Sequence, residues 1–259
     1  MFESRAVAAD TLMLSACLPV PGYGILPVNA FLIRGTEPVL IDTGLAALRG
    51  PFMAALRAQI DPAELRWIWI THMDPDHLGN LEAVLAEAPH ARIVTTYLGM
   101  GKMGLHGLPV ERAFLLNPGQ TLAAGGRDLV AVTPPSFDAP ETTGVFDPAS
   151  RALFSADAFG ALMHEPAEDA AAIGPAALRD GMVTWTTVDA PWLHLVDPGR
   201  YDASLERIRR LDPALVLSGH LPPAHGITDT LLAHLAAART APPFEGPDHA
   251  ALEAMMAAA

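Results

Sequence analysis

The chain has 259 residues, 51% of them apolar, and a formal net charge of −13 from 16 basic and 29 acidic residues. A chain of this length can bury a core without disulfides, and its one cysteine, Cys17, permits no intrachain disulfide. The negative charge argues against nucleic acid and anionic membrane surfaces as partners, because neutralising phosphates requires clustered Lys and Arg.

The sequence predicts neither a leader nor a membrane segment. Residues 1–5 lack the basic region and the continuous apolar stretch of a signal peptide. No run of about 18 apolar residues occurs that would predict a transmembrane helix. Together with the single cysteine, this favours a cytoplasmic protein. We find no internal repeat and no interdomain linker, so residues 1–259 are predicted to form a single domain.

The first third of the chain alternates short apolar runs with amphipathic segments, which predicts alternating strands and helices. Branched and aromatic residues make the run beginning at Arg66 the clearest buried strand. The predicted elements are, in order, strands at Asn29–Arg34 and Pro38–Ile41, a helix at Leu45–Ile60, a strand at Arg66–Thr71, a helix at Leu78–Glu87 and a strand at Arg92–Thr96.

The rest of the chain continues the same alternation after an irregular segment at 159–200 that holds one predicted helix. Strand runs and helices occur in two similar halves, which predicts an α/β protein with an αββα sandwich architecture. The predicted elements are strands at Asp128–Thr133, Gly144–Phe146 and Ala152–Ser155, helices at Pro175–Gly181 and Tyr201–Leu211, a strand at Ala214–Ser218, a helix at Thr228–Arg239 and a short final helix after the proline-rich stretch Ala241–Pro247.

Four candidate metal ligands follow the predicted strand Arg66–Thr71. His72, Asp74, Asp76 and His77 lie within six residues, before a predicted helix. Alternate residues of an extended backbone lie on one side, so residues 72, 74 and 76 are predicted to point the same way. The alternative is a polar loop without metal that caps the helix, because Asp is a common N-cap residue.

This arrangement resembles the metallo-β-lactamase superfamily. The motif of that family is His-x-His-x-Asp-His after a strand, preceded by a strand that ends in Asp-x-Gly, and Asp42-Thr43-Gly44 stands at the expected place. Two later ligands of the family are matched by Asp157, within Ser155–Gly160, and by His220. The resemblance spans residues 28 to 225 and implies the αββα fold for most of the chain.

The sequence departs from the family pattern at two positions. Asp74 stands where the family has its second histidine, and the stretch 134–142, where a third is expected, contains no histidine. Asp138 is assigned to that place by pattern, with Glu141 as the alternative. Both changes replace nitrogen with oxygen, and both fall in the same metal site.

The carboxylate at Asp74 makes the chain resemble the flavodiiron proteins and their single-domain oxygen-binding relatives. Those proteins also carry segments like Pro140-Glu141 and Ser155–Gly160, although they normally keep a histidine where Asp138 stands. No flavodoxin-like domain follows in this sequence. The resemblance therefore implies that electrons come from a separate donor.

The resemblance implies two divalent metal ions in one site. The implied ligands are His72, Asp74 and Asp138 for metal one, Asp76, His77 and His220 for metal two, and Asp157 as the bridge between them. Oxygen-rich ligation favours Fe, with Mn or Zn as alternatives. Asp76 and Asp157 are the candidate catalytic residues, and Asp42 is expected to orient a ligand histidine or a bound water.

Three functions fit these residues. The first is a non-haem di-iron protein that binds or reduces O2. The second is a metal-dependent hydrolase of a small-molecule ester, lactone or phosphoester, with a metal-bridging hydroxide as nucleophile. The third is a degenerate family member with one or no metal and a binding role. Each is compatible with a homo-oligomer.

Two expectations concern residues around the site. We favour His220 over the nearby His225 as the ligand, because His220 directly follows a predicted strand. The irregular segment is expected to roof the site, with core packing as the alternative use of its Met and Trp residues. The residues concerned are Met163, His164, Met182, Trp185 and His194.

Overall fold

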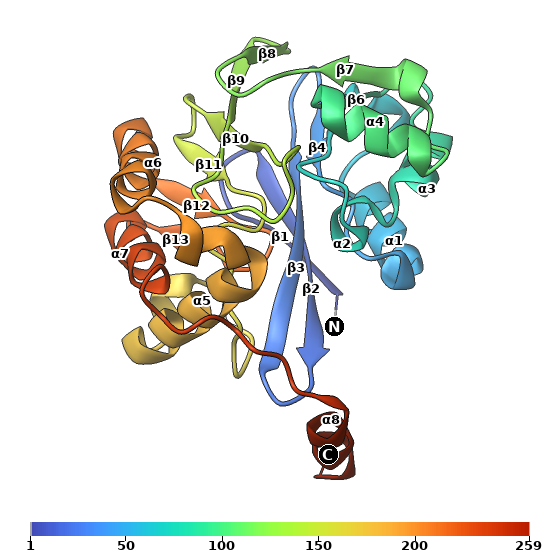
Figure 1. The fold of residues 1–259 in the computed structure, drawn as a ribbon. Helices are drawn as coiled ribbons and strands as arrows, with labels where there is room; N and C mark the ends of the chain where they lie inside the picture. Colours follow the sequence, from blue (N-terminus) through green and yellow to red (C-terminus); the bar gives the residue numbers. More distant parts are fainter. Residues whose placement is uncertain (1, 259) are drawn as a thin grey trace.

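The computed structural model describes residues 2–258 and shows two β-sheets packed face to face, with helices on both outer sides (Figure 1). In the first sheet, spatial order follows chain order. Its strands are β1 (Phe2–Ala6), β2 (Thr11–Val20), β3 (Gly24–Ile33), β4 (Val39–Ile41), β5 (Trp67–Trp69), β6 (Arg92–Thr95) and β7 (Ala113–Leu115). The pairs from β1 to β4 are antiparallel, and those from β4 to β7 are parallel.

The second sheet has the strand order β13-β12-β11-β10-β9-β8. Its strands are β8 (Thr121–Ala124), β9 (Arg127–Val132), β10 (Gly144–Asp147), β11 (Ala152–Phe154), β12 (Leu215–Leu217) and β13 (Ala224–His225). The pair β11–β12 is parallel, and the others are antiparallel. Parallel neighbours need a long crossover connection, and the chain between β11 and β12 supplies one that contains two helices.

The helices divide between the two sheets. Figure 1 shows α1–α4 beside the first sheet, α5–α7 beside the second, and α8 beyond the β2–β3 hairpin. Their bounds are α1 (Arg49–Gln59), α2 (Pro75–Leu78), α3 (Leu81–Glu87), α4 (Tyr97–Leu105), α5 (Pro175–Asp189), α6 (Pro198–Leu211), α7 (Thr228–Ala238) and α8 (His249–Ala258). Within residues 2–258, no helix has the length and apolar character needed to cross a membrane.

Three apolar layers hold the sandwich together. The middle layer lies between the sheets, where Phe31 of β3 meets Phe154 of β11 with ring centroids 5.3 Å apart. Trp69 of β5 is fully buried in this layer. Each outer layer joins one sheet to its own helices. The predicted αββα sandwich is therefore confirmed, and the predicted helices and strands occur with shifts at their ends.

The first strand pair differs from the sequence prediction. β3 begins at Gly24 rather than at Asn29, and β2 pairs with its whole length from Thr11 to Val20. The turn at 21–23 joins the two strands. The long hairpin was not predicted because its first strand carries weak alternation of apolar and polar residues, since both faces are largely buried.

Two helices also differ from the prediction. α4 was not predicted, because its three glycines disfavour a helix. α5 continues to Asp189, although the sequence predicts an end at Gly181. Gly181 is a contact residue rather than a helix stop, because a Cβ there would collide with the backbone carbonyl of Leu162. The extra two turns of α5 carry Asp189 toward the end of the sandwich.

Candidate metal centre

The seven predicted ligands converge at the strand ends between the two sheets. They form overlapping groups in which the ligand atoms lie within 4.8 Å of one another. The groups are His72, Asp74 and Asp138, which we call the first half; Asp76, His77 and His220, which we call the second half; and His72, His77 and Asp157, which joins the halves. The first of these ligands in the chain is His72 and the last is His220, 148 residues later.

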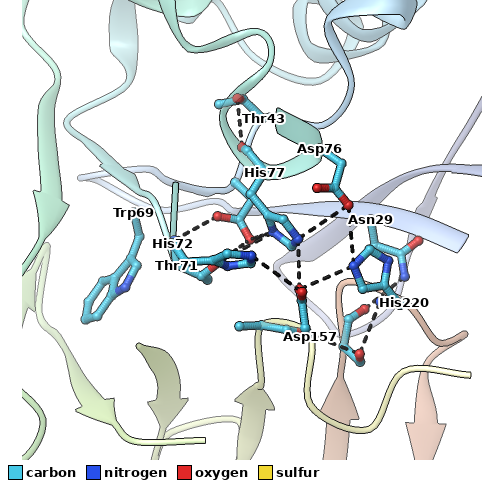
Figure 2. A network of polar contacts seen from close by, with 12 residues as sticks. Asn29, Thr43, Trp69, Thr71, His72, Asp76, His77, Asp157 and His220 are labelled. Atoms are coloured by element: carbon cyan, nitrogen blue, oxygen red, sulfur yellow. Dashed lines mark hydrogen bonds and ion pairs between the residues drawn. The ribbon is translucent and has the colours of Figure 1, made fainter. Parts of the chain in front are cut away.

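Asp157 lies between the halves, as Figure 2 shows. Its Oδ1 is 2.8 Å from His77 Nε2 and 3.3 Å from His220 Nε2, whereas its Oδ2 is 3.4 Å from His72 Nε2. The two oxygens of one carboxylate thus face histidines of different halves. This is the geometry required of a carboxylate shared by two cations.

Asp42 orients His77 through the ring nitrogen that faces away from Asp157. Its Oδ2 is 2.8 Å from His77 Nδ1, so the Nε2 atom faces Asp157. The same carboxylate accepts hydrogen bonds from the backbone N–H and the hydroxyl of Thr71. Asp42 has a φ of 60°, a left-handed conformation that costs energy for a residue other than glycine. The expected orienting role of Asp42 agrees with these contacts.

His220 is oriented by the first sheet although it follows a strand of the second. Its Nδ1 is 2.7 Å from the carbonyl oxygen of Pro27 in β3. The amide of Asn29 donates to the carbonyls of Ser218 and Leu221 on either side of His220. Both sheets must therefore be packed together for His220 to face the other ligands.

Two glycines permit the close packing of the ligand loops. A Cβ on Gly219 would lie 2.9 Å from the His77 ring, and a Cβ on Gly160 would lie 2.8 Å from Cβ of His220 and collide with the Trp185 ring. Any larger residue would push ligand side chains apart. These glycines accompany Asp157 and His220 in the sequence for a steric reason.

The first half is less enclosed than the second. His72 is fully buried, but the side chain of Asp138 is 32% exposed. Asp138 Oδ1 is 4.0 Å from His72 Nε2. The loop carrying Asp138 is held by Thr143, which donates its backbone N–H to Thr71 and accepts from the indole of Trp69. The side chain of Asp138 is therefore more exposed than that of Asp76 in the second half, which is 25% exposed.

Glu141, the alternative to Asp138, lies outside the three groups. Its buried carboxylate accepts a hydrogen bond of 2.5 Å from Lys102 in α4. Asp138, by contrast, belongs to the group with His72 and Asp74. The geometry thus favours Asp138 as the candidate ligand of this loop.

The backbone of the motif differs from the extended path that the sequence suggested. Pro75 is the first residue of α2, because proline is favoured at that position of a helix. Asp74 precedes the helix, whereas Asp76 and His77 belong to its first turn. The extended backbone predicted for residues 72–76 therefore ends at Asp74, although the side chains of His72, Asp74 and Asp76 all belong to the ligand groups. Asp74 and Asp76 belong to different halves of the centre.

Asp189 is a site residue that sequence reasoning missed. One of its carboxylate oxygens groups with those of Asp138 and Asp157 within 4.8 Å. Asp189 follows no motif and lies beyond the predicted end of its helix, so no signal in the sequence singled it out. Burial, and then the nearby carboxylates of Asp157 and Asp138, raise its pKa well above the usual value.

Of the residues expected to roof the site, Trp185 lies beside the ligands. Its ring lies 4.6 Å from that of His220, centroid to centroid, and its indole N–H donates to the carbonyl of Asp157. Met163 and Met182 belong to the apolar layer between the second sheet and its helices. For these two residues the core-packing alternative holds. His225 lies away from the centre, with its Nδ1 2.6 Å from Asp169.

The histidines and Asp157 are electrostatically coupled. Burial lowers the pKa of His77, but the carboxylates of Asp157 and Asp42 outweigh it and hold that pKa well above the ordinary value. His72 behaves similarly: burial and His77 lower its pKa, and Asp157 raises it further than they lower it. Burial raises the pKa of Asp157, but His77, His72 and His220 bring it well below the ordinary value. The carboxylates thus favour protonated imidazoles, and the imidazoles favour an ionised Asp157.

The buried nitrogen and oxygen atoms of the centre suit metal ions as ligands. The Nε2 atoms of His72, His77 and His220 and the Oδ1 of Asp157 are buried without a hydrogen-bond partner among the described residues. Buried polar atoms normally have hydrogen-bond partners, so four neighbouring buried atoms without a partner require an explanation. Imidazole nitrogens and carboxylate oxygens are ordinary ligands of iron, manganese and zinc. Two cations would satisfy all four atoms.

Comparison with known proteins places this geometry in a family context. Residues 23–220 match the metallo-beta-lactamase superfamily. Type A flavoprotein fprA of Rhodobacter capsulatus is 35% identical over 144 residues, which are 51% of this chain and 31% of that protein. The anaerobic nitric oxide reductase flavorubredoxin of Salmonella arizonae is 34% identical over 134 residues, which are 51% of this chain and 28% of that protein. The matched part thus spans about a third or less of these relatives.

Solved structures share the fold. A mutant of the flavo di-iron protein from Thermotoga maritima superposes with a TM-score of 0.80 at 20% identity, covering 95% of this chain and 64% of that one. The 1–254 fragment of putative diflavin flavoprotein A 5 from Nostoc superposes with a TM-score of 0.77 at 18% identity, covering 92% of this chain and 95% of the fragment. At such identities the likeness concerns the fold alone.

Proposed function

This chain belongs to the metallo-β-lactamase superfamily, and from that premise we propose that it is a non-haem di-iron redox protein that binds and reduces a small diatomic gas such as O2 or NO. The two irons, when bound, supply and share the electrons for the reduction. A separate redox protein or cofactor provides those electrons. The names of two relatives, a flavoprotein and a nitric oxide reductase, support this class of chemistry.

The observation that carries the proposal is the position of Asp157. One of its oxygens faces His72 and the other faces His77 and His220, so a single carboxylate serves both halves. His72, Asp74 and Asp138 would hold one iron, and Asp76, His77 and His220 the other. Asp76 and Asp157 would border the space between the irons and are the proposed catalytic residues.

The oxygen-rich ligands support iron over zinc. Asp74, Asp76, Asp138 and Asp157 together balance the charge of two divalent ions and stabilise a higher oxidation state. The same carboxylates make each ion a weaker Lewis acid, which disfavours the hydrolase alternative. Manganese shares the preference for oxygen ligands and is the next candidate metal.

Anaerobic iron loading tests the proposal. Metal-free protein is titrated with ferrous iron, the bound iron is counted, and O2 or NO consumption is followed with a chemical reductant. We expect two irons per chain, gas consumption that depends on iron, and new near-ultraviolet absorption on oxidation. Retention of fewer than two irons, or turnover of esters and lactones by a zinc form with no gas consumption by the iron form, would contradict it.

Asp138→His provides a sharper test of metal choice. It restores a nitrogen donor where relatives normally have one, so the first half should shift its preference from iron toward zinc. Competition between the two metals, read by elemental analysis, measures the shift. Glu141→His is the matched control, because Glu141 lies outside the three ligand groups.

A further inference from the structure

The Asp189 side chain lies at the end of α5 and faces the centre from the side of the second sheet. One of its oxygens lies within 4.8 Å of ligand atoms of both Asp138 and Asp157. Asp189 is 6% exposed, and its Oδ2 is buried without a hydrogen-bond partner among residues 2–258. Asp189 is therefore a buried carboxyl group next to the carboxylates of Asp138 and Asp157 rather than a surface charge near them.

The neighbouring structure holds Asp189 next to Asp138. The short helix at 191–195 follows α5 directly, and its Trp192 donates an indole N–H to the carbonyl of Phe137 at 2.7 Å. The rings of Trp192 and Phe137 also pack with centroids 5.2 Å apart. These contacts tie the two chain segments together immediately beside the two carboxylates.

Three buried or half-buried carboxylates this close together need a positive charge or a proton between them. A buried carboxylate without either is costly. The three histidines of the centre lie around Asp157, and His72 Nε2 is 4.0 Å from Asp138. The group that contains Asp189 holds only the carboxylates of Asp138, Asp157 and Asp189. A divalent cation at the first half would satisfy both carboxylates and the orphaned oxygen at once.

We propose that Asp189 is an additional carboxylate ligand of the first half of the centre, next to Asp138 and Asp157. The proposal rests on the di-iron function proposed above. It gives the centre a fifth carboxylate, which leaves two divalent ions with one excess negative charge and favours the ferric state further. The first half then becomes a hard, oxygen-dominated site in which His72 is the single nitrogen ligand.

The test compares Asp189→Asn with Asp180→Asn. The first variant keeps the side-chain shape and removes the charge. The second removes an exposed aspartate of the same helix, which pairs with Arg179 at the surface. Both variants and the unaltered chain are titrated anaerobically with ferrous iron in a calorimeter, and with manganese followed by its electron paramagnetic resonance signal.

We expect Asp189→Asn to weaken one of the two metal-binding steps on the order of tenfold or more and to raise the reduction potential of the iron in that half. Asp180→Asn should bind both metals as the unaltered chain does. X-ray absorption of the iron form should show about half an oxygen neighbour fewer per iron for Asp189→Asn, because one of the two irons loses one ligand.

The outcomes separate this inference from the proposed function. If the unaltered chain binds two irons and Asp189→Asn binds them with the same affinity and potential, Asp189 is a protonated structural carboxyl and the inference is wrong, while the di-iron function stands. If the unaltered chain binds fewer than two metals of either kind, both fail. Thermal unfolding of the metal-free variants checks that folding is preserved in each.

Discussion

The two halves of the centre differ in how far their ligands are buried and held in place. In the second half, the histidine rings are buried and fixed through their far nitrogens, His77 by Asp42 and His220 by the carbonyl of Pro27. In the first half, His72 is the one nitrogen donor, its Nδ1 approaches only the hydroxyl of Thr71, and the side chain of Asp138 is 32% exposed. The second half resembles a rigid binding site, and the first an open one rich in negative charge.

This difference teaches where each property of the centre comes from. Buried nitrogen ligands that are held in place fix the coordination geometry of the metal, since they cannot rearrange around it. An exposed set of oxygens selects hard cations, and it leaves room for a small molecule to approach. We therefore expect changes in the second half to affect how tightly metal is held, and changes in the first half to affect which metal is held.

The largest effect is expected from Asp157→Asn, because Asp157 belongs to both halves. The change removes the charge that faces His72, His77 and His220 and should reduce bound iron from two per chain to less than one. Elemental analysis after anaerobic loading measures this. Asp128→Asn, an exposed aspartate of β9, is the control. Two irons retained by Asp157→Asn would show that the halves do not share a ligand.

Asp42→Asn should affect metal binding in the two halves unequally. It removes the charge behind His77 and keeps the side-chain shape, and asparagine tolerates the left-handed backbone of residue 42. We expect one metal-binding step to weaken by about 10–100-fold, as for the loss of other ligand-orienting carboxylates, and the other to change less. Calorimetric titration resolves the two steps. Equal losses in both steps would contradict the assignment of Asp42 to the second half alone.

The pH dependence of metal uptake is expected to have a definite sign. The carboxylates around His72 and His77 outweigh burial and raise the pKa of both rings, so each ring keeps its proton to a higher pH than a free imidazole does, and a cation must displace that proton. Metal affinity should therefore increase as the pH rises toward the raised pKa values, with proton release on binding. Titrations in buffers of different ionisation enthalpy measure the protons released, and an affinity that falls as the pH rises would contradict this.

The metal-free protein should show the opposite trend. A pKa raised by folding stabilises the folded chain fully below the unfolded value of about 6.5, and that stability is lost as the pH rises through the folded value. For Asp157, with its lowered pKa, the stabilisation is lost in acid, as the pH falls through its folded value. Thermal unfolding of metal-free protein from pH 6 to 9 should show a falling midpoint that bound metal abolishes.

The smallest effect is expected from Glu141→Gln. The change weakens the contact between Lys102, whose side chain is 41% exposed, and the buried side chain of residue 141, so the loss of unfolding free energy should be about 1–3 kcal/mol. Both metals should remain bound. Chemical denaturation and elemental analysis measure the two quantities. If Glu141→Gln lost one metal, Glu141 would again be a candidate ligand.

The sequence predicted the second half better than the first. His77 and His220 stand in segments with a fixed spacing to strands, and strand ends are positions that local sequence reveals. Asp138 lies in a loop without regular structure, so its place could be assigned only between two acidic residues. The αββα architecture followed from the alternation of apolar runs, which reflects burial directly.

Asp189 could not have been predicted, because its position depends on contacts between distant parts of the chain. α5 continues past Gly181, where the glycine packs against the backbone of Leu162. The pairing of Trp192 with Phe137 joins the loop of Asp138 to the short helix that follows α5. Local propensity predicts neither contact, since both are tertiary.

The contacts of β3 with the loop around His220 place ligands from both sheets at one centre. Cations at the centre would fasten the N-terminal sheet, which carries His72 and His77, to the C-terminal sheet, which carries Asp157 and His220. Separating the sheets would then require releasing the ions. At a free-metal concentration a thousand times the dissociation constant, this linkage adds about 4 kcal/mol to the unfolding free energy. Iron supply would thereby govern how long the folded chain survives proteolysis.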